Sequence, residues 1–295
     1  MTTATVPRPL DHLVLPVWSL GEARRRLASL GFTVAPDARH PFGTGNACVF
    51  FRNRTYLEPL AVLDEATARR AEADGLFFVS RAKAFLATRG EGFAMVALKD
   101  KDAEAAQRAF EAAGVSAGPM FEFARLAAQP DGSEREIGVR LAYAADPRAP
   151  DATLFACEAV GRSVNSGEDF VDHPNGALGV ASVTAVAGRP AEFDAFLSAV
   201  AGEPETGVAS QAPDAGPDAA RIVVLTPDAF RETYGLPAPD PGPGFVLAAF
   251  DVAVRDLADA QAYAGANAVR RGGRILVPPA PGLGAVLAFR STEHD

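Results

Sequence analysis

The order strand, helix, strands recurs along the chain and limits its fold more than any other feature. The first copy starts with LDHLVLPV at residues 10–17, continues through an amphipathic helix and ends with YLEPLAV at residues 56–62. Gly31 follows its helix, and Gly114 and Gly202 follow the next two helices, at spacings of 83 and 88 residues. These repeats predict modules with the element order βαβββ.

Four such modules are expected, and the predicted fold class is α+β. After the first, modules begin with strands at residues 92–98, 178–187 and 244–254, and a helical link is expected at 63–91. Within the modules, a strand is expected to start at Phe32–Val34 and the fourth helix to end near Asn267.

The modules are expected to pair into two domains with curved, mostly antiparallel sheets. The predicted division is an N-terminal domain at 1–160, a linker at 161–177 and a degenerate C-terminal domain at 178–295. Helices should cover one face of each sheet and leave the concave face open for a ligand.

Composition excludes several kinds of partner. The net charge is −9 and no dense Lys/Arg block occurs, so nucleic acid is not expected to bind. No apolar run approaches the roughly 20 residues of a membrane helix, and the N-terminal residues show no leader pattern. The only two cysteines, Cys48 and Cys157, form no CxxC pair and are expected to be buried thiols, which favours a cytoplasmic location.

His12 and Glu58 are the most informative polar residues, because each interrupts an apolar strand. Strand alternation places His12 on the same face as Val14, and Glu58 on the same face as Leu60. A buried Glu58 needs a metal, a histidinium or an arginine as partner. A single histidine in a strand is more often a hydrogen-bonded core or rim residue than a ligand.

Further candidates lie in the loop RHPFGTGN and in a strand of module two. His40, Thr44 and Asn46 are expected at a pocket mouth, although a plain turn explains the same glycine-rich pattern. Arg140 lies within the apolar stretch IGVRLAYA, where it would face Glu58, a substrate carboxylate or solvent.

Paired βαβββ modules with the motifs LDHLVLPV, RHPFGTGNACVFF and RTYLEPLAV resemble the vicinal oxygen chelate superfamily, in particular its glyoxalase-like branch. The resemblance implies a divalent metal (Zn, Ni, Mn or Fe) on the concave face. The metal ligands would be His12, Glu58 and Glu158. The catalytic residues would be Glu58 and His40, and Thr44, Asn46 and Arg140 would bind the substrate.

The implied function is metal-assisted lyase or isomerase chemistry on a small oxygenated metabolite, through an enediolate-like intermediate. Ring-cleaving dioxygenation ranks lower, because its second histidine would have to be His40 from a loop. The alternative is a metal-free protein that binds or sequesters a small molecule. It is favoured by Met95 at the position matching His12 and by the bare first strands GVASVTAV and VLAAF. The C-terminal half is therefore expected to be a scaffold or a dimerisation domain, which leaves a homodimer open.

Overall fold

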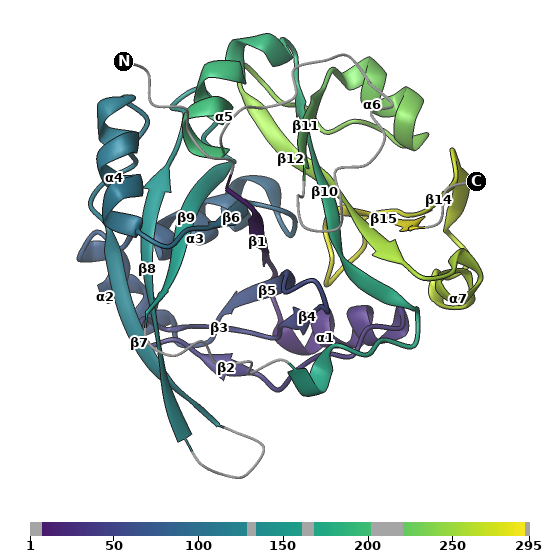
Figure 1. Ribbon diagram of the computed structural model, residues 1–295, viewed down its shortest axis with the longest axis horizontal. Coiled ribbons are helices and arrows are strands. Elements are labelled where there is room, and N and C mark those ends of the chain that lie inside the picture. Colours follow the sequence, from purple (N-terminus) through teal and green to yellow (C-terminus); the bar gives the residue numbers. More distant parts are fainter. Residues whose placement is uncertain (1–7, 129–133, 161–167, 202–220, 293–295) are drawn as a thin grey trace.

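The computed structural model describes residues 8–128, 134–160, 168–201 and 221–292. These residues form two curled, mixed sheets with helices around them. In Figure 1 the first sheet, in purple to teal, lies beside the second sheet, in teal-green to yellow. This architecture confirms the predicted α+β class with two glyoxalase-like sheet units.

The first sheet has nine strands, and β4 pairs with β5 outside the main order β2-β3-β5-β1-β6-β9-β8-β7. Modules one and two meet where β1 pairs antiparallel with β6, and each of these strands pairs parallel with the last strand of its own module. The strands are β1 (Leu10–Pro16), β2 (Ala38–Arg39), β3 (Thr44–Asn46), β4 (Val49–Phe50), β5 (Tyr56–Val62), β6 (Met95–Lys99), β7 (Phe121–Ala128), β8 (Glu134–Ala144) and β9 (Thr153–Val160).

The second sheet has six strands in the order β11-β10-β12-β15-β14-β13, and β10 and β12 pair antiparallel at its centre. The strands are β10 (Ala177–Ala187), β11 (Arg221–Leu225), β12 (Phe245–Val254), β13 (Val269–Arg271), β14 (Arg274–Val277) and β15 (Val286–Ser291). The helices of the chain are α1 (Leu20–Ser29), α2 (Glu65–Ala73), α3 (Phe77–Arg89), α4 (Ala103–Ala112), α5 (Asp194–Ala201), α6 (Pro227–Tyr234) and α7 (Leu257–Tyr263), with short 3₁₀ turns at Glu168–Phe170 and Pro190–Phe193. None of the helices in the described ranges is long and apolar enough to cross a membrane.

Both faces of the first sheet are covered. Helices α1 and α4 pack on one face, where Leu27 and Phe110 join the largest hydrophobic cluster. Helices α2 and α3 pack on the other face, where Phe78 and Phe85 contact a second cluster that includes Val14 and Leu60 of the strands. The expectation of an open concave face is therefore wrong here. The predicted helical link at 63–91 does form, and its apolar side chains close this face.

Three local elements differ from the sequence prediction. Phe32–Val34 is not a strand, because the amide of Thr33 bonds to the His173 ring instead of to a neighbouring strand. Helix α7 ends at Tyr263 rather than near Asn267, and Gly265 follows with a φ of +82° that ends a helix readily. Helix α6 was not predicted. Thr226 caps its first turn and Pro227 occupies N1, so its start signal is local.

Modules one, two and four show the predicted elements with small shifts, whereas module three is shorter in the described residues. It has β10, α5 and β11, and then α6 takes the place of further strands. Residues 202–220, between α5 and β11, lie outside the described residues, as do residues 161–167 of the linker predicted at 161–177. The predicted domain boundaries stay a prediction, and the largest hydrophobic cluster contains residues of both sheets.

The two sheet units approach each other closely at Gly284. A Cβ atom there would lie 1.9 Å from the backbone oxygen of Glu91, far inside van der Waals contact. We expect Gly284→Ala to lower the free energy of unfolding by about 2 kcal/mol, because backbone must move to admit a methyl group. Gly188→Ala is the matched control, since a Cβ there meets nothing within 4 Å. Equal urea midpoints for the two variants would contradict the close approach.

Candidate functional site

A β-bulge in β1 places the Asp11 side chain next to His12. Leu10 pairs with Leu98 and His12 with Ala97, so Asp11 is an extra residue in β1. Bulges redirect side chains, and here the Asp11 carboxylate turns toward its neighbour instead of to the opposite face. Its Oδ2 atom lies 2.7 Å from Nδ1 of His12. The bulge thus fixes the imidazole with Nδ1–H toward Asp11 and leaves Nε2 facing into the fold.

The His12 ring lies between aromatic rings and a carboxylate. It stacks on Tyr56, with ring centroids 4.3 Å apart and 16° between the planes, and it meets the edge of Phe155 at 5.5 Å. Nε2 of His12 lies 3.4 Å from Oε2 of Glu58. Strand alternation on β1 and β5 therefore brings His12 and Glu58 to the same face, as predicted, and close to each other.

Glu58 is 5% exposed, and its carboxylate is held from two sides. Its Oε1 atom accepts a hydrogen bond of 2.7 Å from Nδ2 of Asn46, and it lies 3.8 Å from Nε2 of His40. The amide of Asn46 also lies 3.2 Å from that same Nε2 atom. One carboxylate oxygen thus faces His12, and the other faces Asn46 and His40.

The segment RHPFGTGN supplies the second side of the site. Thr44 and Asn46 lie on the short strand β3, which pairs with β5, rather than in a loop as predicted. The Thr44 hydroxyl lies 2.8 Å from Nδ1 of His40. The His40 ring stacks on Phe42, with ring centroids 5.0 Å apart. Five predicted residues, namely His12, His40, Thr44, Asn46 and Glu58, are therefore brought into one buried cluster.

The surroundings of the cluster disfavour additional negative charge. Burial raises the pKa of Tyr56 well above its usual value, and the carboxylates of Asp11 and Glu58 raise it further. Burial, followed by the same carboxylates, also raises the pKa of the Cys157 thiol. Cys157 therefore stays protonated near neutral pH and is no candidate nucleophile.

Sequence reasoning missed three residues of this site. Asp11 should face away from His12 by simple alternation, and only the bulge turns it inward. Tyr56 alternates onto the same face as Glu58, but nothing in the sequence indicated that its ring would stack on His12. Tyr143 is 1% exposed, belongs to the same cluster as Val14, and its hydroxyl has no hydrogen-bond partner among the described residues.

The structure does not bring Glu158 or Arg140 to this site. Glu158 accepts a hydrogen bond of 2.9 Å from the amide of Ala103 at the start of α4, on the opposite face of the sheet. Arg140 is its register partner and forms an ion pair of 2.9 Å with Glu122 on the next strand. Glu122 also raises the pKa of Arg140. Neither residue faces Glu58. Side chains alternate along a strand, and the adjacent residues Leu141 and Cys157 lie on the face of Glu58, so Arg140 and Glu158 lie on the opposite face.

Strand register identifies the residues of module two that correspond to His12 and Glu58 of module one. In β1 and β6, His12 pairs with Ala97 and Val14 with Met95, so the internal symmetry relates His12 to Met95. In the parallel strand pairs, Tyr56 lies beside His12, and Thr153 lies beside Met95. Glu58 is two residues after Tyr56, and Phe155 is two residues after Thr153, so Phe155 is the symmetric equivalent of Glu58. The symmetric positions thus hold a thioether and a phenyl ring instead of an imidazole and a carboxylate.

These residues can be tested against the divalent metal that the superfamily resemblance implies. Asp11 on Nδ1 of His12 is an arrangement common behind metal-bound imidazoles, and Glu58 would be a second ligand. A third ligand is missing, because Asn46 lies against both the Glu58 carboxylate and Nε2 of His40, and Met95 and Phe155 offer no oxygen or nitrogen. Among the described residues, no three His, Cys, Asp or Glu side chains are arranged to hold a metal ion. The described residues therefore do not fit a complete metal site.

The second sheet contains its own buried polar cluster, which the sequence prediction overlooked. Asp251 of β12 is fully buried and accepts from Arg274 at 2.9 Å and from the Tyr234 hydroxyl at 3.2 Å. Thr184 lies 2.7 Å from the same hydroxyl. The Asp251 carboxylate raises the pKa of Arg274. Each side chain has a partner, so the cluster is compatible with the scaffold role expected for this half.

Comparison with solved structures supports the fold across nearly the whole chain. A hypothetical protein from Staphylococcus aureus superposes with a TM-score of 0.61 at 12% identity, covering 96% of this chain and 98% of that one. A mutant 4-hydroxymandelate synthase from Streptomyces coelicolor gives 0.55 at 14% identity, with 97% and 93% covered. The Mn(II)-bound glyoxalase from Novosphingobium aromaticivorans gives 0.52 at 13% identity, with 97% and 83% covered.

No curated protein sequence matches the chain. A family described as glyoxalase-like domain matches residues 10–201. This range starts at β1, contains the whole cluster around Glu58 and extends through β10 and α5 of the second sheet unit. The chain therefore belongs to the glyoxalase-like domain family.

Proposed function

We propose that the protein is a glyoxalase-like enzyme that moves a proton on a small oxygenated metabolite, as a lyase or an isomerase. The observation that carries this proposal is the buried Glu58 carboxylate held between His12 and Asn46. A carboxylate in such a dry, hydrogen-bonded setting is a suitable general base for a carbon next to a carbonyl group.

Each neighbour has a defined part in this proposal. Glu58 removes the proton, and Asn46 fixes the orientation of its carboxylate. His12 gives or takes a proton at Nε2, since Asp11 holds its Nδ1–H. The Tyr143 hydroxyl, which has no hydrogen-bond partner in the described part of the chain, is a donor for the oxygen on which negative charge develops. His40 lies at the other carboxylate oxygen, where it can take part as a second acid or base.

The test is hydrogen–deuterium exchange at carbon, followed by proton NMR in D₂O. The probes are hydroxyacetone, glycolaldehyde and the hemithioacetal of methylglyoxal with a small thiol, each with a hydrogen next to a carbonyl or masked carbonyl group. We expect the wild-type protein to accelerate exchange in at least one probe. Saturable binding of a probe without any exchange would contradict the enzyme and support a binding protein.

A metal-free protein that binds or sequesters a small molecule is the second candidate. Apolar Met95 and Phe155 at the symmetric half-site favour it, as does the aromatic wall formed by Phe42, Phe78 and Phe123 around His40. Ligand pockets are mostly apolar with a few placed polar groups, and this cluster has that composition. A small molecule is the partner in both proposals, whereas a homodimer and a cytoplasmic location stay predictions.

Metal content is a further prediction. We expect protein purified without a histidine tag to hold clearly less than one equivalent of Zn, Ni, Mn or Fe, because no group of three His, Cys, Asp or Glu side chains in the described part of the chain is arranged to hold a metal ion. Inductively coupled plasma mass spectrometry of the wild type, His12→Ala and Glu158→Gln measures this directly. One equivalent in the wild type and in Glu158→Gln, lost in His12→Ala, would show that a metal completes the site.

A further inference from the structure

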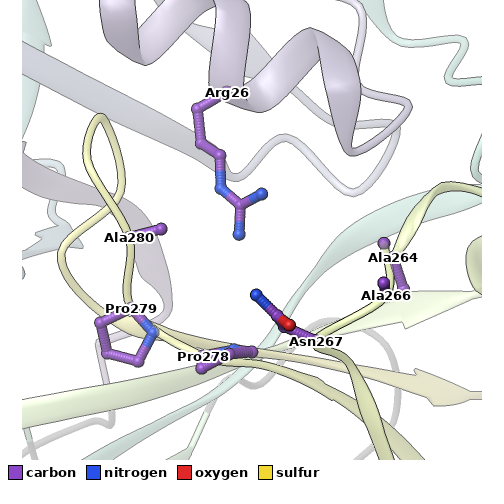
Figure 2. Close-up of a pocket in the computed structure, with 8 residues that line it drawn as sticks. Arg26, Ala264, Ala266, Asn267, Pro278, Pro279 and Ala280 are labelled. Carbon is purple, nitrogen blue, oxygen red and sulfur yellow. The ribbon is translucent and has the colours of Figure 1, made fainter.

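A separate cavity lies at the junction of the two sheet units. It has a volume of about 140 Å³, and Figure 2 shows Arg26 pointing into it from α1 on one side. The opposite side consists of the turn after α7, with Asn267, and the segment after β14, with Pro278 and Pro279. We call it the junction cavity, and its eight lining residues are Arg26, Ala264, Gly265, Ala266, Asn267, Pro278, Pro279 and Ala280.

Arg26 has no protein partner for its charge within the described residues. Its Nε atom is buried and makes no hydrogen bond, and no Asp or Glu lines the cavity. Burial lowers the pKa of Arg26, with no neighbouring carboxylate to offset this effect. By contrast, Arg24 on the same helix forms an ion pair with Asp37. A guanidinium that is partly desolvated and unpaired is costly unless an anion completes it.

We propose that the junction cavity binds a short-chain monocarboxylate, with its carboxylate on the two Nη groups of Arg26 and its hydrocarbon part against the alanines and prolines. The planar guanidinium fork matches a carboxylate in a bidentate arrangement. Asn267 lies across the cavity from Arg26, where its amide can donate a further hydrogen bond.

Size and charge both favour a small monoanion over phosphate. A cavity of about 140 Å³ is small, which favours a ligand of a few heavy atoms such as propionate. One guanidinium balances one negative charge, whereas a phosphate dianion would leave a charge unpaired among apolar walls. The alanine and proline side chains offer favourable contact to a short alkyl group and none to phosphate oxygens.

The walls of the junction cavity are held in place without the ligand. Glu91 accepts hydrogen bonds from the amide of Gly282 at 2.6 Å and from the amide of Trp18 at 2.8 Å, which ties the segment after β14 to the N-terminal unit. Ala280 and Leu283 exchange backbone hydrogen bonds of 3.0 and 2.9 Å. A ligand would therefore meet a formed site and lose little affinity to reorganisation.

The test is titration of the full-length protein with sodium propionate, sodium acetate and inorganic phosphate by calorimetry, at an ionic strength matched with sodium chloride. We expect saturable propionate binding to the wild type, at least tenfold weaker in Arg26→Gln. Arg25→Gln is the matched control, because Arg25 is exposed on the same helix and does not line the cavity. Arg25→Gln should bind propionate as the wild type does.

A second signature separates lost binding from lost folding. Without ligand, Arg26→Gln should melt no lower than the wild type, because an unpaired charge has been removed. Ala280→Leu fills the cavity from the opposite wall and should also weaken propionate binding. No saturable binding of propionate or acetate, equal affinity in Arg26→Gln, or tighter binding of phosphate than of either carboxylate would each overturn the proposal.

Discussion

Glu58→Gln is expected to lower the rate of carbon–hydrogen exchange at least about a hundredfold, which is the usual contribution of a general base. Glutamine has nearly the same shape, and its side-chain oxygen can still accept the hydrogen bond from Asn46. It cannot take a proton at neutral pH. The melting temperature should not fall, because a buried carboxylate is replaced by a neutral amide.

Glu158→Gln is the matched control for this variant. This substitution makes the same chemical change on a strand of the same sheet. The Glu158 side chain, however, faces α4 on the other side of the sheet and accepts a hydrogen bond from the amide of Ala103. Its exchange rate should equal that of the wild type. If Glu58→Gln retained the rate of Glu158→Gln, Glu58 would not be the base, even if exchange itself were catalysed.

Acidification is expected to destabilise the fold through His173. Burial lowers the pKa of His173 from 6.5 to about 4, and the carbonyl of Phe50 and the carboxylate of Asp172 offset part of that effect. The amide of Thr33 donates to Nδ1 at 3.0 Å, and Nε2 lies 2.9 Å from the oxygen of Phe50. A proton on Nδ1 would remove the acceptor of Thr33. The neutral ring is therefore the form that the fold requires.

The sign of the pH effect follows from these values. Above pH 6.5 the ring is neutral in both the folded and the unfolded chain, and the contribution of His173 is fully present. Between pH 6.5 and about pH 4 only the unfolded chain takes up the proton, so the free energy of unfolding decreases as the pH decreases. The loss at the lower limit is about 3 kcal/mol, at 1.36 kcal/mol per unit of pKa.

Urea unfolding of the wild type and His173→Gln across this pH range measures the effect. Other acidic groups titrate as well, so the informative quantity is the difference between the two curves. The free energies of unfolding should converge as pH falls, because only the wild type has a histidine to protonate. Parallel curves for His173→Gln and the wild type would show that His173 is not the group responsible.

Much of the fold could be predicted because its signals are local. Apolar periodicity and helix-ending glycines identified the strands β1 and β5 and the helices α1 to α4 with small shifts. Helix α6 had equally local signals in Thr226 and Pro227 and was overlooked rather than hidden. The strand predicted at Phe32–Val34 failed because its backbone bonds to the His173 side chain, 140 positions away in sequence.

The site also contains some residues that local patterns predict and others that depend on strand pairing. His12 and Glu58 share a face because side chains alternate along a strand, and this rule needs no tertiary information. Glu158 was expected with them, whereas strand register relates Glu58 to Phe155 and so places Glu158 on the opposite face. A shift of one residue moves every side chain to the other face, and only the pairing of β6 with β9 fixes it.

The sequence by itself determined the βαβββ modules, the family and the pairing of His12 with Glu58, because each depends on patterns within a few dozen residues. The tertiary structure alone decided that α2 and α3 close the concave face and that a bulge turns Asp11 toward His12. It also decided that Arg26 projects into a cavity formed with the C-terminal unit. These features depend on contacts between distant segments, whose register and packing no local pattern encodes.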